Sequence, residues 1–246
     1  MPTLLLSPRH SEDTRILWRA AMREGWQVHR VHNWRVPDVS TNDLTIYGEP
    51  LLTRHIARQL RLHLEEPPLD WLPQLPSDLR KRDVRLTTLG EARQNGERAF
   101  VKPADEKGFD ATVSDSGAKL PGPDLYPDHL PVLIQEVVHW QTEFRCFVLG
   151  TKVLTAAPYW LHGKPAQDPD GQWLSDVPEL LEAIAFAEQV LSDSGLLHPN
   201  AFVLDVGQIA DRGWAVIEAN AATSSGLYGC DPSEALKVIR ASVRPA

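Results

Sequence analysis

Two acidic residues and an amide in one short segment carry the clearest chemical signal in this sequence. Residues 201–220, AFVLDVGQIADRGWAVIEAN, are typical of a two-stranded hairpin. If its turn is centred on residues 211–212, Asp205 lies opposite Glu218, and Asn220 points to the same face. Like charges that face each other across paired strands destabilise a sheet by up to about 1 kcal/mol, so this placement among apolar neighbours needs a reason.

Metal binding would supply that reason. Two carboxylates and an amide oxygen on one face form a set of hard oxygen ligands suited to Mg²⁺ or Mn²⁺, with phosphate groups completing the coordination. The alternative is that Asp205 faces solvent and that Glu218 pairs with a lysine. The residues of the hairpin taken alone leave both interpretations open.

A strand and a loop that carry lysines provide a cationic counterpart. The strand AFVKP (99–103) contains Lys102 near its end, and the loop 104–110 follows with Lys107 and Gly108. An ammonium group at a strand end is suited to binding phosphates, and a loop with a flexible glycine could fold over them as a lid. The chain has no Walker A motif and no GxGxxG pattern, so a solvated loop is the alternative interpretation.

The composition of the chain limits the setting in which this chemistry takes place. Of the 246 residues, 42% are hydrophobic and 24% are charged, as is typical of a globular protein. No apolar run approaches the roughly 20 residues that span a bilayer, so we expect no membrane partner. The two cysteines form no disulfide framework, which favours a cytoplasmic location. The net charge of −8 makes nucleic acid an unfavourable partner.

The elements that must position these residues indicate an α+β fold behind a smaller α/β lobe. Residues 1–66 alternate between strand and helix patterns, and the last of these helices is predicted over 50–64. The proline-rich segment 65–76 predicts a linker. From residue 77 onward, short strands and antiparallel hairpins predominate, with one strongly amphipathic helix predicted over 176–195.

In their order along the chain, these segments resemble the ATP-grasp superfamily. FVKP with its following loop is similar to the strand lysine and phosphate lid of that superfamily, and LDVG…VIEAN is similar to its metal-binding signature. The segment IQEVVHWQTEFRCFVLGTKV (134–153) resembles the crossing between its two nucleotide-binding lobes. The resemblance covers about residues 84–231 and is greatest to compact ATP-grasp proteins of bacteria and phages. It implies that lobes 67–133 and 134–246 sandwich ATP, with the α/β lobe 1–66 preceding them.

The resemblance also implies a role for individual residues. The implied ligands of Mg²⁺ or Mn²⁺ are Asp205, Glu218 and Asn220. The residues implied to bind ATP are Arg85, Lys102, Lys107, Gln135, Glu136, Val137, Val138, Glu143 and Arg145. Within that set, the segment QEVV (135–138) would face adenine, Glu143 would hold the ribose hydroxyls, and Arg145 would face the terminal phosphate. Arg85 is the best placed of three candidates for a second phosphate-binding residue, the others being Lys81 and Arg82.

The activity that the resemblance implies is ATP-dependent ligation of a carboxylate to an amine or thiol through an acyl phosphate. Such chemistry requires neutralisation of charge at the γ-phosphate rather than a protein nucleophile, and Lys102 and Arg145 are the implied catalytic residues. The expected substrate is an amino acid, a peptide or a protein. A kinase and a nucleotide-binding module without catalysis are the alternatives, and the oligomeric state is left open.

Overall fold

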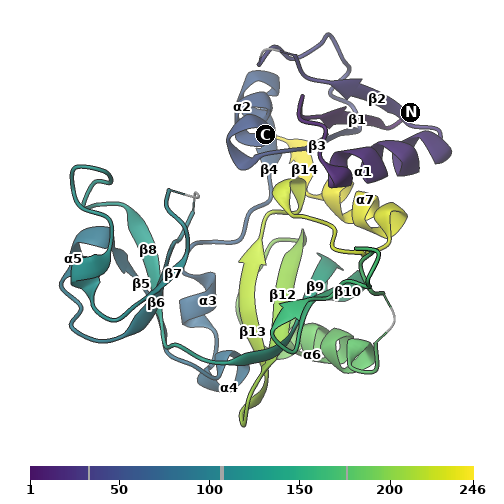
Figure 1. Ribbon diagram of the computed structural model, residues 1–246. Coiled ribbons are helices and arrows are strands. Elements are labelled where there is room, and N and C mark those ends of the chain that lie inside the picture. Colours follow the sequence, from purple (N-terminus) through teal and green to yellow (C-terminus); the bar gives the residue numbers. More distant parts are fainter. Residues whose placement is uncertain (33, 106–107, 176) are drawn as a thin grey trace.

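Three lobes make up the fold, each with its own main sheet (Figure 1). The structure is a computed structural model that describes residues 1–32, 34–105, 108–175 and 177–246. Helices and antiparallel strands are mixed along the chain, which confirms the predicted α+β class. No helix within the described ranges is both long and apolar enough to cross a membrane.

The first lobe is a parallel three-stranded sheet with a helix on each face. Its elements are β1 (Thr3–Leu6), α1 (Glu12–Arg23), β2 (Gln27–Arg30), β3 (Leu44–Tyr47) and α2 (Pro50–Leu60), and the strand order is β2-β1-β3. Successive side chains of a strand point to opposite faces. Leu4 and Leu6 of β1 accordingly pack in one core with α1, while Leu5 packs in another core with α2.

The end of α2 differs from the prediction. The helix was expected to continue to residue 64, but it ends at Leu60 because Arg61 adopts the left-handed conformation, with φ of 55°. Residues Leu62–Leu64 form β4 instead, which pairs with the C-terminal strand β14 (Val243–Pro245). The end of the chain is thereby fastened to the first lobe.

The second lobe is built on an antiparallel sheet with the order β5-β8-β6-β7. Its elements are α3 (Trp71–Gln74), α4 (Ser77–Arg80), β5 (Val84–Thr88), α5 (Leu89–Arg93), β6 (Ala99–Pro103), β7 (Thr112–Ser114), η1 (Gly117–Lys119) and β8 (Pro131–Gln135). Thr88 and Glu91 form a capping box at the start of α5. Val101 and Ile134 face the core beneath α5, so the alternate residues Phe100, Lys102 and Gln135 face the other way.

The third lobe contains a five-stranded antiparallel sheet with the order β11-β10-β9-β12-β13. Its elements are β9 (Trp140–Leu149), β10 (Lys152–Leu161), β11 (Lys164–Pro165), α6 (Leu180–Asp193), β12 (Ala201–Ile209), β13 (Gly213–Asn220), η2 (Ala222–Ser224) and α7 (Pro232–Ala241). One face of the sheet packs on α6, and the other packs partly on α7. The helix α6 lies within the predicted range 176–195.

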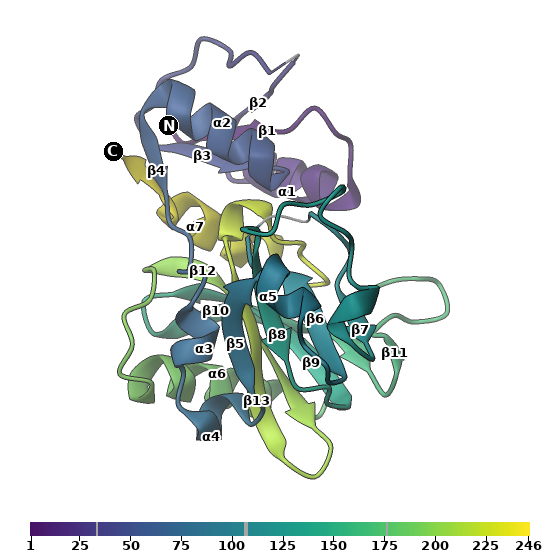
Figure 2. The same cartoon turned by 90° about the vertical axis from the view of Figure 1, so that its left-hand side faces the viewer.

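The lobes exchange elements. In the view of Figure 1, α7 lies beside α1, and both contribute to one hydrophobic core. The short helices α3 and α4, which precede the second sheet in the chain, contribute Trp71 and Leu79 to the core of the third lobe. In the turned view, the four-stranded sheet stands in front of the five-stranded sheet (Figure 2). The two sheets are therefore held in a defined relation by the helices that precede β5.

Candidate active site

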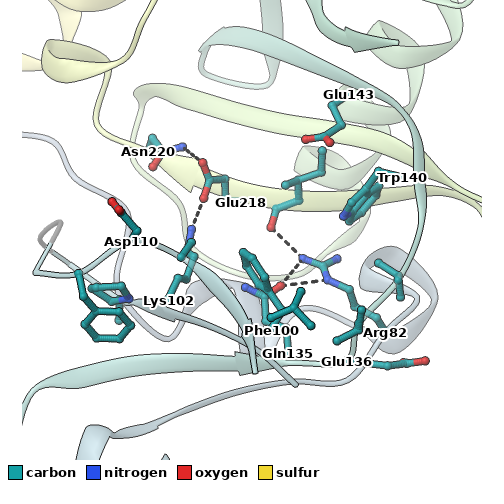
Figure 3. Close-up of a pocket in the computed structure, with 18 of the residues that line it drawn as sticks. Arg82, Phe100, Lys102, Asp110, Gln135, Glu136, Trp140, Glu143, Glu218 and Asn220 are labelled. Atoms are coloured by element: carbon teal, nitrogen blue, oxygen red, sulfur yellow. Dashed lines mark hydrogen bonds and ion pairs between the residues drawn. The ribbon is translucent and has the colours of Figure 1, made fainter. Parts of the chain in front are cut away.

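A cleft of about 710 Å³ lies between the sheets of the second and third lobes (Figure 3). This volume is in the range of pockets that bind small molecules and cofactors. Most of the residues predicted to bind ATP or metal line it: Lys102, Gln135, Glu136, Val137, Val138, Glu143, Glu218 and Asn220. The structure thus brings together residues that are more than 100 positions apart in the sequence.

Lys102 and Glu218 form an ion pair across this cleft. Lys102 comes from β6 of the second lobe and Glu218 from β13 of the third, and Figure 3 shows the two side chains pointing toward one another. Asn220 Nδ2 donates a hydrogen bond of 2.9 Å to the other carboxylate oxygen of Glu218. Burial alone would raise the pKa of Glu218, but Lys102 and Asn220 lower it to about 2. Glu218 is therefore an anion at neutral pH.

The pairing of Asp205 with Glu218 is confirmed, although the hairpin reaches it by a different route. From the turn up to the pair Val206–Val216, the strands are offset by one residue from the predicted register. A bulge at Ile217 adds one residue to β13, and beyond it Asp205 faces Glu218 as expected. The bulge therefore decides which carboxylate reaches the cleft.

Arg82 binds the backbone of this bulge. Its guanidinium donates to the carbonyl oxygens of Val216, at 2.6 Å, and of Ile217, at 2.9 Å. The same group donates to Gln135 Oε1 at 2.9 and 3.1 Å and lies 5.0 Å from the ring centroid of Trp140. Figure 3 shows this arrangement beneath Glu143. Arg82 consequently ties the second lobe to the strand that carries Glu218.

The basic residue preferred from the sequence is corrected by the strand register. Arg85 pairs with Ile134, which in turn pairs with Val101, so Arg85 lies on the sheet face turned away from the cleft. Its side chain is exposed, whereas Arg82 is buried and lines the cleft. The alternation of Val84, Arg85 and Leu86 is a signal in the sequence that could have excluded Arg85.

Asp205 is fully buried and is bound by Arg145 of the neighbouring strand β9, which rules out the solvent-facing alternative. Arg145 Nε lies 3.0 Å from Oδ1 of Asp205, and Nη2 lies 2.7 Å from Oδ2. The guanidinium carbon is 4.6 Å from the ring centroid of Tyr228 and 5.7 Å from that of Tyr159. Burial raises the pKa of Asp205, and the charge of Arg145 opposes that rise. The repulsion between Asp205 and Glu218 is thus offset by a separate cation on each carboxylate.

The predicted metal ligands are adjacent but not equally accessible. Glu218 and Asn220 line the cleft, whereas both carboxylate oxygens of Asp205 accept hydrogen bonds from Arg145. In the described part of the chain, no group of three His, Cys, Asp or Glu side chains is arranged to hold a metal ion. The carboxylate and amide oxygens of Glu218 and Asn220 are of the type that Mg²⁺ prefers, and these two residues fit a shared site with phosphate oxygens. Their role as ligands remains a prediction.

The hinge and ribose residues lie at the cleft with different side-chain environments. Glu143 accepts a hydrogen bond of 2.7 Å from the Tyr159 hydroxyl, and burial raises its pKa. The side chain of Glu136 pairs with Arg212 at 2.6 Å and is turned away from the other residues in Figure 3. Any contact of Glu136 with a base in the cleft is therefore expected from its backbone. The predicted phosphate residue Lys107 lies outside the described residues.

Arg145 lines a second, smaller pocket of about 310 Å³ rather than the cleft itself. The two spaces share Ala104, Asp105, Glu218 and Asn220 in their walls, so the pocket adjoins the cleft at the Lys102–Glu218 ion pair. Several residues that line the cleft were not singled out in the sequence, among them Phe100, Trp140, Tyr159 and Ile217. Trp140 and Tyr159 lie at opposite ends of the hairpin formed by β9 and β10, which the sequence did predict.

Comparison with known proteins gives a consistent result. A family model described as an ATP-grasp domain, family 2 of its clade, matches residues 79–238. The crystal structure of the D-cycloserine synthetase DcsG is similar with a TM-score of 0.58 and 13% identity, covering 97% of this chain and 98% of that chain. A RimK domain ATP-grasp protein from Sphaerobacter thermophilus has a TM-score of 0.55 and 16% identity, with 98% and 97% covered.

A third similar structure is the macrocyclase MdnC bound with the precursor peptide MdnA from Microcystis aeruginosa MRC. Its TM-score is 0.53 at 14% identity, with 96% of this chain and 98% of that chain covered. At these identities the likeness concerns the fold. No curated protein sequence matches the chain significantly.

Proposed function

Since the family model matches residues 79–238, this chain belongs to the ATP-grasp superfamily, and we propose that it is an ATP-dependent ligase. ATP-grasp enzymes generally use ATP together with divalent metal ions. We propose that this protein joins a carboxylate to an amine or thiol through an acyl phosphate. The similar structures include a D-cycloserine synthetase and a macrocyclase bound with its precursor peptide, and both titles agree with a substrate of amino-acid or peptide character.

The observation that carries this proposal is the ion pair between Lys102 and Glu218 in the cleft. It places an ammonium group from one lobe against a carboxylate and an amide from the other lobe. A triphosphate with Mg²⁺ requires both kinds of group at one point, because cations must face its oxygens while oxygen ligands hold the metal. The metal, when bound, would neutralise charge on the phosphates.

The remaining cleft residues fit the other parts of ATP. Gln135, Val137 and Val138 come from the segment that crosses between the lobes, and they supply backbone groups and apolar surface for adenine. Glu143 provides a carboxylate at the distance of two strand residues from Arg145, on the same face of β9. We assign Glu143 to the ribose hydroxyls and Arg145 to the region of the terminal phosphate.

The proposed reaction has two displacement steps. In the first, a carboxylate oxygen of the donor substrate attacks the γ-phosphorus, the bond from that phosphorus to the bridging oxygen breaks, and ADP leaves. In the second, an amine attacks the acyl carbon, the bond from that carbon to the phosphate oxygen breaks, phosphate leaves, and the nitrogen loses a proton. Lys102 and Arg145 stabilise the negative charge that develops on the transferred phosphoryl group, which is the main requirement of such chemistry.

Oxygen-isotope transfer tests this proposal. Purified protein is incubated with ATP, Mg²⁺, an amine and a pool of carboxylic acids labelled with ¹⁸O in the carboxylate. A ligase that works through an acyl phosphate moves one labelled oxygen from the carboxylate to inorganic phosphate, which mass spectrometry detects. Phosphate that remains attached to a product would identify a kinase instead. ATP binding without any ADP release would identify a nucleotide-binding module without catalysis.

A further inference from the structure

The small pocket beside the cleft has contributions from all three lobes. Pro50, Arg54 and Glu66 come from the first lobe or its exit, Asp105 from the second, and Arg145 from the third. Its volume of about 310 Å³ is at the lower end of the range for small-molecule sites. Because it shares Glu218 and Asn220 with the cleft, a molecule in this pocket would lie directly beside the predicted triphosphate position.

The inner wall of the pocket presents a rigidly held cation. An arginine has five N–H donors, and the bonds from Arg145 to Asp205 and to the Gly226 carbonyl oxygen use three of them. Tyr228 holds the guanidinium from one side and has a left-handed backbone, with φ of 47°, next to Gly229. Such backbone conformations are costly for a residue with a side chain and are often found at binding sites. The remaining donors of Arg145 suit a ligand carboxylate.

The outer rim of the pocket has the opposite character. Glu66 accepts hydrogen bonds from Arg54 at 2.9 and 3.0 Å, and Asp105 also pairs with Arg54. Among the described residues of this rim, two carboxylates therefore share one guanidinium. Each ionised carboxylate can accept about four hydrogen bonds, so Glu66 and Asp105 retain acceptor capacity. An excess of negative charge with open acceptors favours an ammonium group.

We propose that this pocket binds an amino acid as the carboxylate-donating substrate. The ligand's carboxylate lies between Arg145 and the shared wall of Glu218 and Asn220, and its ammonium group faces Glu66 and Asp105. This inference rests on the proposed ligase function. The opposed charges of the two ends set the direction of the ligand, so that the carboxylate and not the amine meets the phosphates. The volume admits a single amino acid and excludes most of a larger substrate.

Steady-state kinetics with matched ligands test this assignment. ADP release is measured with ATP, Mg²⁺, hydroxylamine as the amine, and each of the twenty proteinogenic amino acids. Every active amino acid is then compared with the carboxylic acid that has the same side chain but no amino group. The protein variants are Glu66→Gln and Asp105→Asn, with Glu188→Gln as a control on the surface of α6, where Glu188 pairs with Lys152. The affinity for ATP is measured on each variant by calorimetry.

We expect at least one amino acid to stimulate ADP release, and its counterpart without the amino group to have a KM higher by about tenfold or more. That factor corresponds to the loss of one hydrogen bond to a charged group. Glu66→Gln and Asp105→Asn should raise the KM for the amino acid and remove its advantage over the counterpart. Glu188→Gln should change neither value. The use of two rim variants keeps the test valid if one of them fails to fold.

Two results would overturn the assignment. One is a protein that binds ATP but responds to no amino acid; the other is an unchanged KM in both rim variants. A protein that binds no ATP would instead contradict the proposed function, so the two failures are distinguishable.

Discussion

Two ion pairs hold the carboxylates of the β12–β13 hairpin, and they differ in where their cations come from. Arg145 and Asp205 are neighbours within one sheet, and their side chains are 9% and 1% exposed. Lys102 and Glu218 come from two lobes, and their side chains are 20% and 27% exposed. The carboxylates face each other directly, yet one pair is part of the interior of a lobe and the other closes a cleft.

This difference indicates which pair can be exchanged for a ligand. Separating a buried pair leaves an uncompensated charge in a medium of low dielectric constant, which is strongly unfavourable. Separating a pair that water can reach costs little, because solvent and a new partner replace the lost contact. We infer that Arg145–Asp205 is a fixed frame, and that ATP with Mg²⁺ competes with Lys102 for Glu218.

The largest expected effect is on the buried pair. Replacing Asp205 with Asn leaves the buried Arg145 without its counter-charge and should lower the free energy of unfolding by about 3–5 kcal/mol. The matched change on the facing residue, Glu218→Gln, should alter it by about 1 kcal/mol or less. Chemical denaturation of both variants measures the difference. Equal losses would show that the two pairs contribute to stability in the same way.

A smaller effect is expected at the arginine that joins the lobes beside the exchangeable pair. Arg82→Met removes the donors that bind the bulge carbonyls of Val216 and Ile217 and the Gln135 side chain. Unsatisfied buried acceptors cost about 1–3 kcal/mol, and the loss of the bulge should also weaken ATP binding. Arg85→Met, on the far face of the same sheet, should change stability by no more than about 0.5 kcal/mol. A loss of ATP affinity in Arg85→Met but not in Arg82→Met would reverse our correction.

The smallest effect is the pH dependence of the exposed pair. The pKa of Glu218 is lowered in the folded protein to about 2, below its usual value of 4.5. A lowered carboxyl pKa contributes stability above the unfolded value, and that contribution is lost as the pH falls through the folded value. The difference in unfolding free energy between wild type and Glu218→Gln should therefore be constant above about pH 5 and vanish toward pH 2. A difference that grows on acidification would contradict the pairing with Lys102.

The sequence predicted most elements of both regions because their patterns are local. The periodicity of the hairpins, the capped start of α5 and the strand that carries Lys102 all appear where expected. The end of α2 could not be predicted, because Arg61 turns the chain so that β4 can pair with a strand almost 180 residues later. Local propensity contains no information on such a distant partner.

The site was predicted less completely for a similar reason. The facing carboxylates of Asp205 and Glu218 were found from strand geometry, but the bulge at Ile217 that aligns them depends on donors from Arg82 in another lobe. Likewise, the hairpin pattern does not reveal that each carboxylate has its own cation, since Lys102 and Arg145 come from other strands. Sequence spacing identifies which residues share a face, whereas contacts between sheets follow only from the tertiary fold.

Calorimetric titration of ATP into the wild type and into Glu218→Gln, each with and without Mg²⁺, tests the central claim most directly. If Glu218 exchanges Lys102 for a nucleotide-bound metal, Mg²⁺ should tighten ATP binding to the wild type by about tenfold or more, which is about 1.4 kcal/mol. In Glu218→Gln, Mg²⁺ should have little effect, because the charged ligand is missing while the shape of the side chain is kept. An equal gain from Mg²⁺ in both proteins would contradict the account.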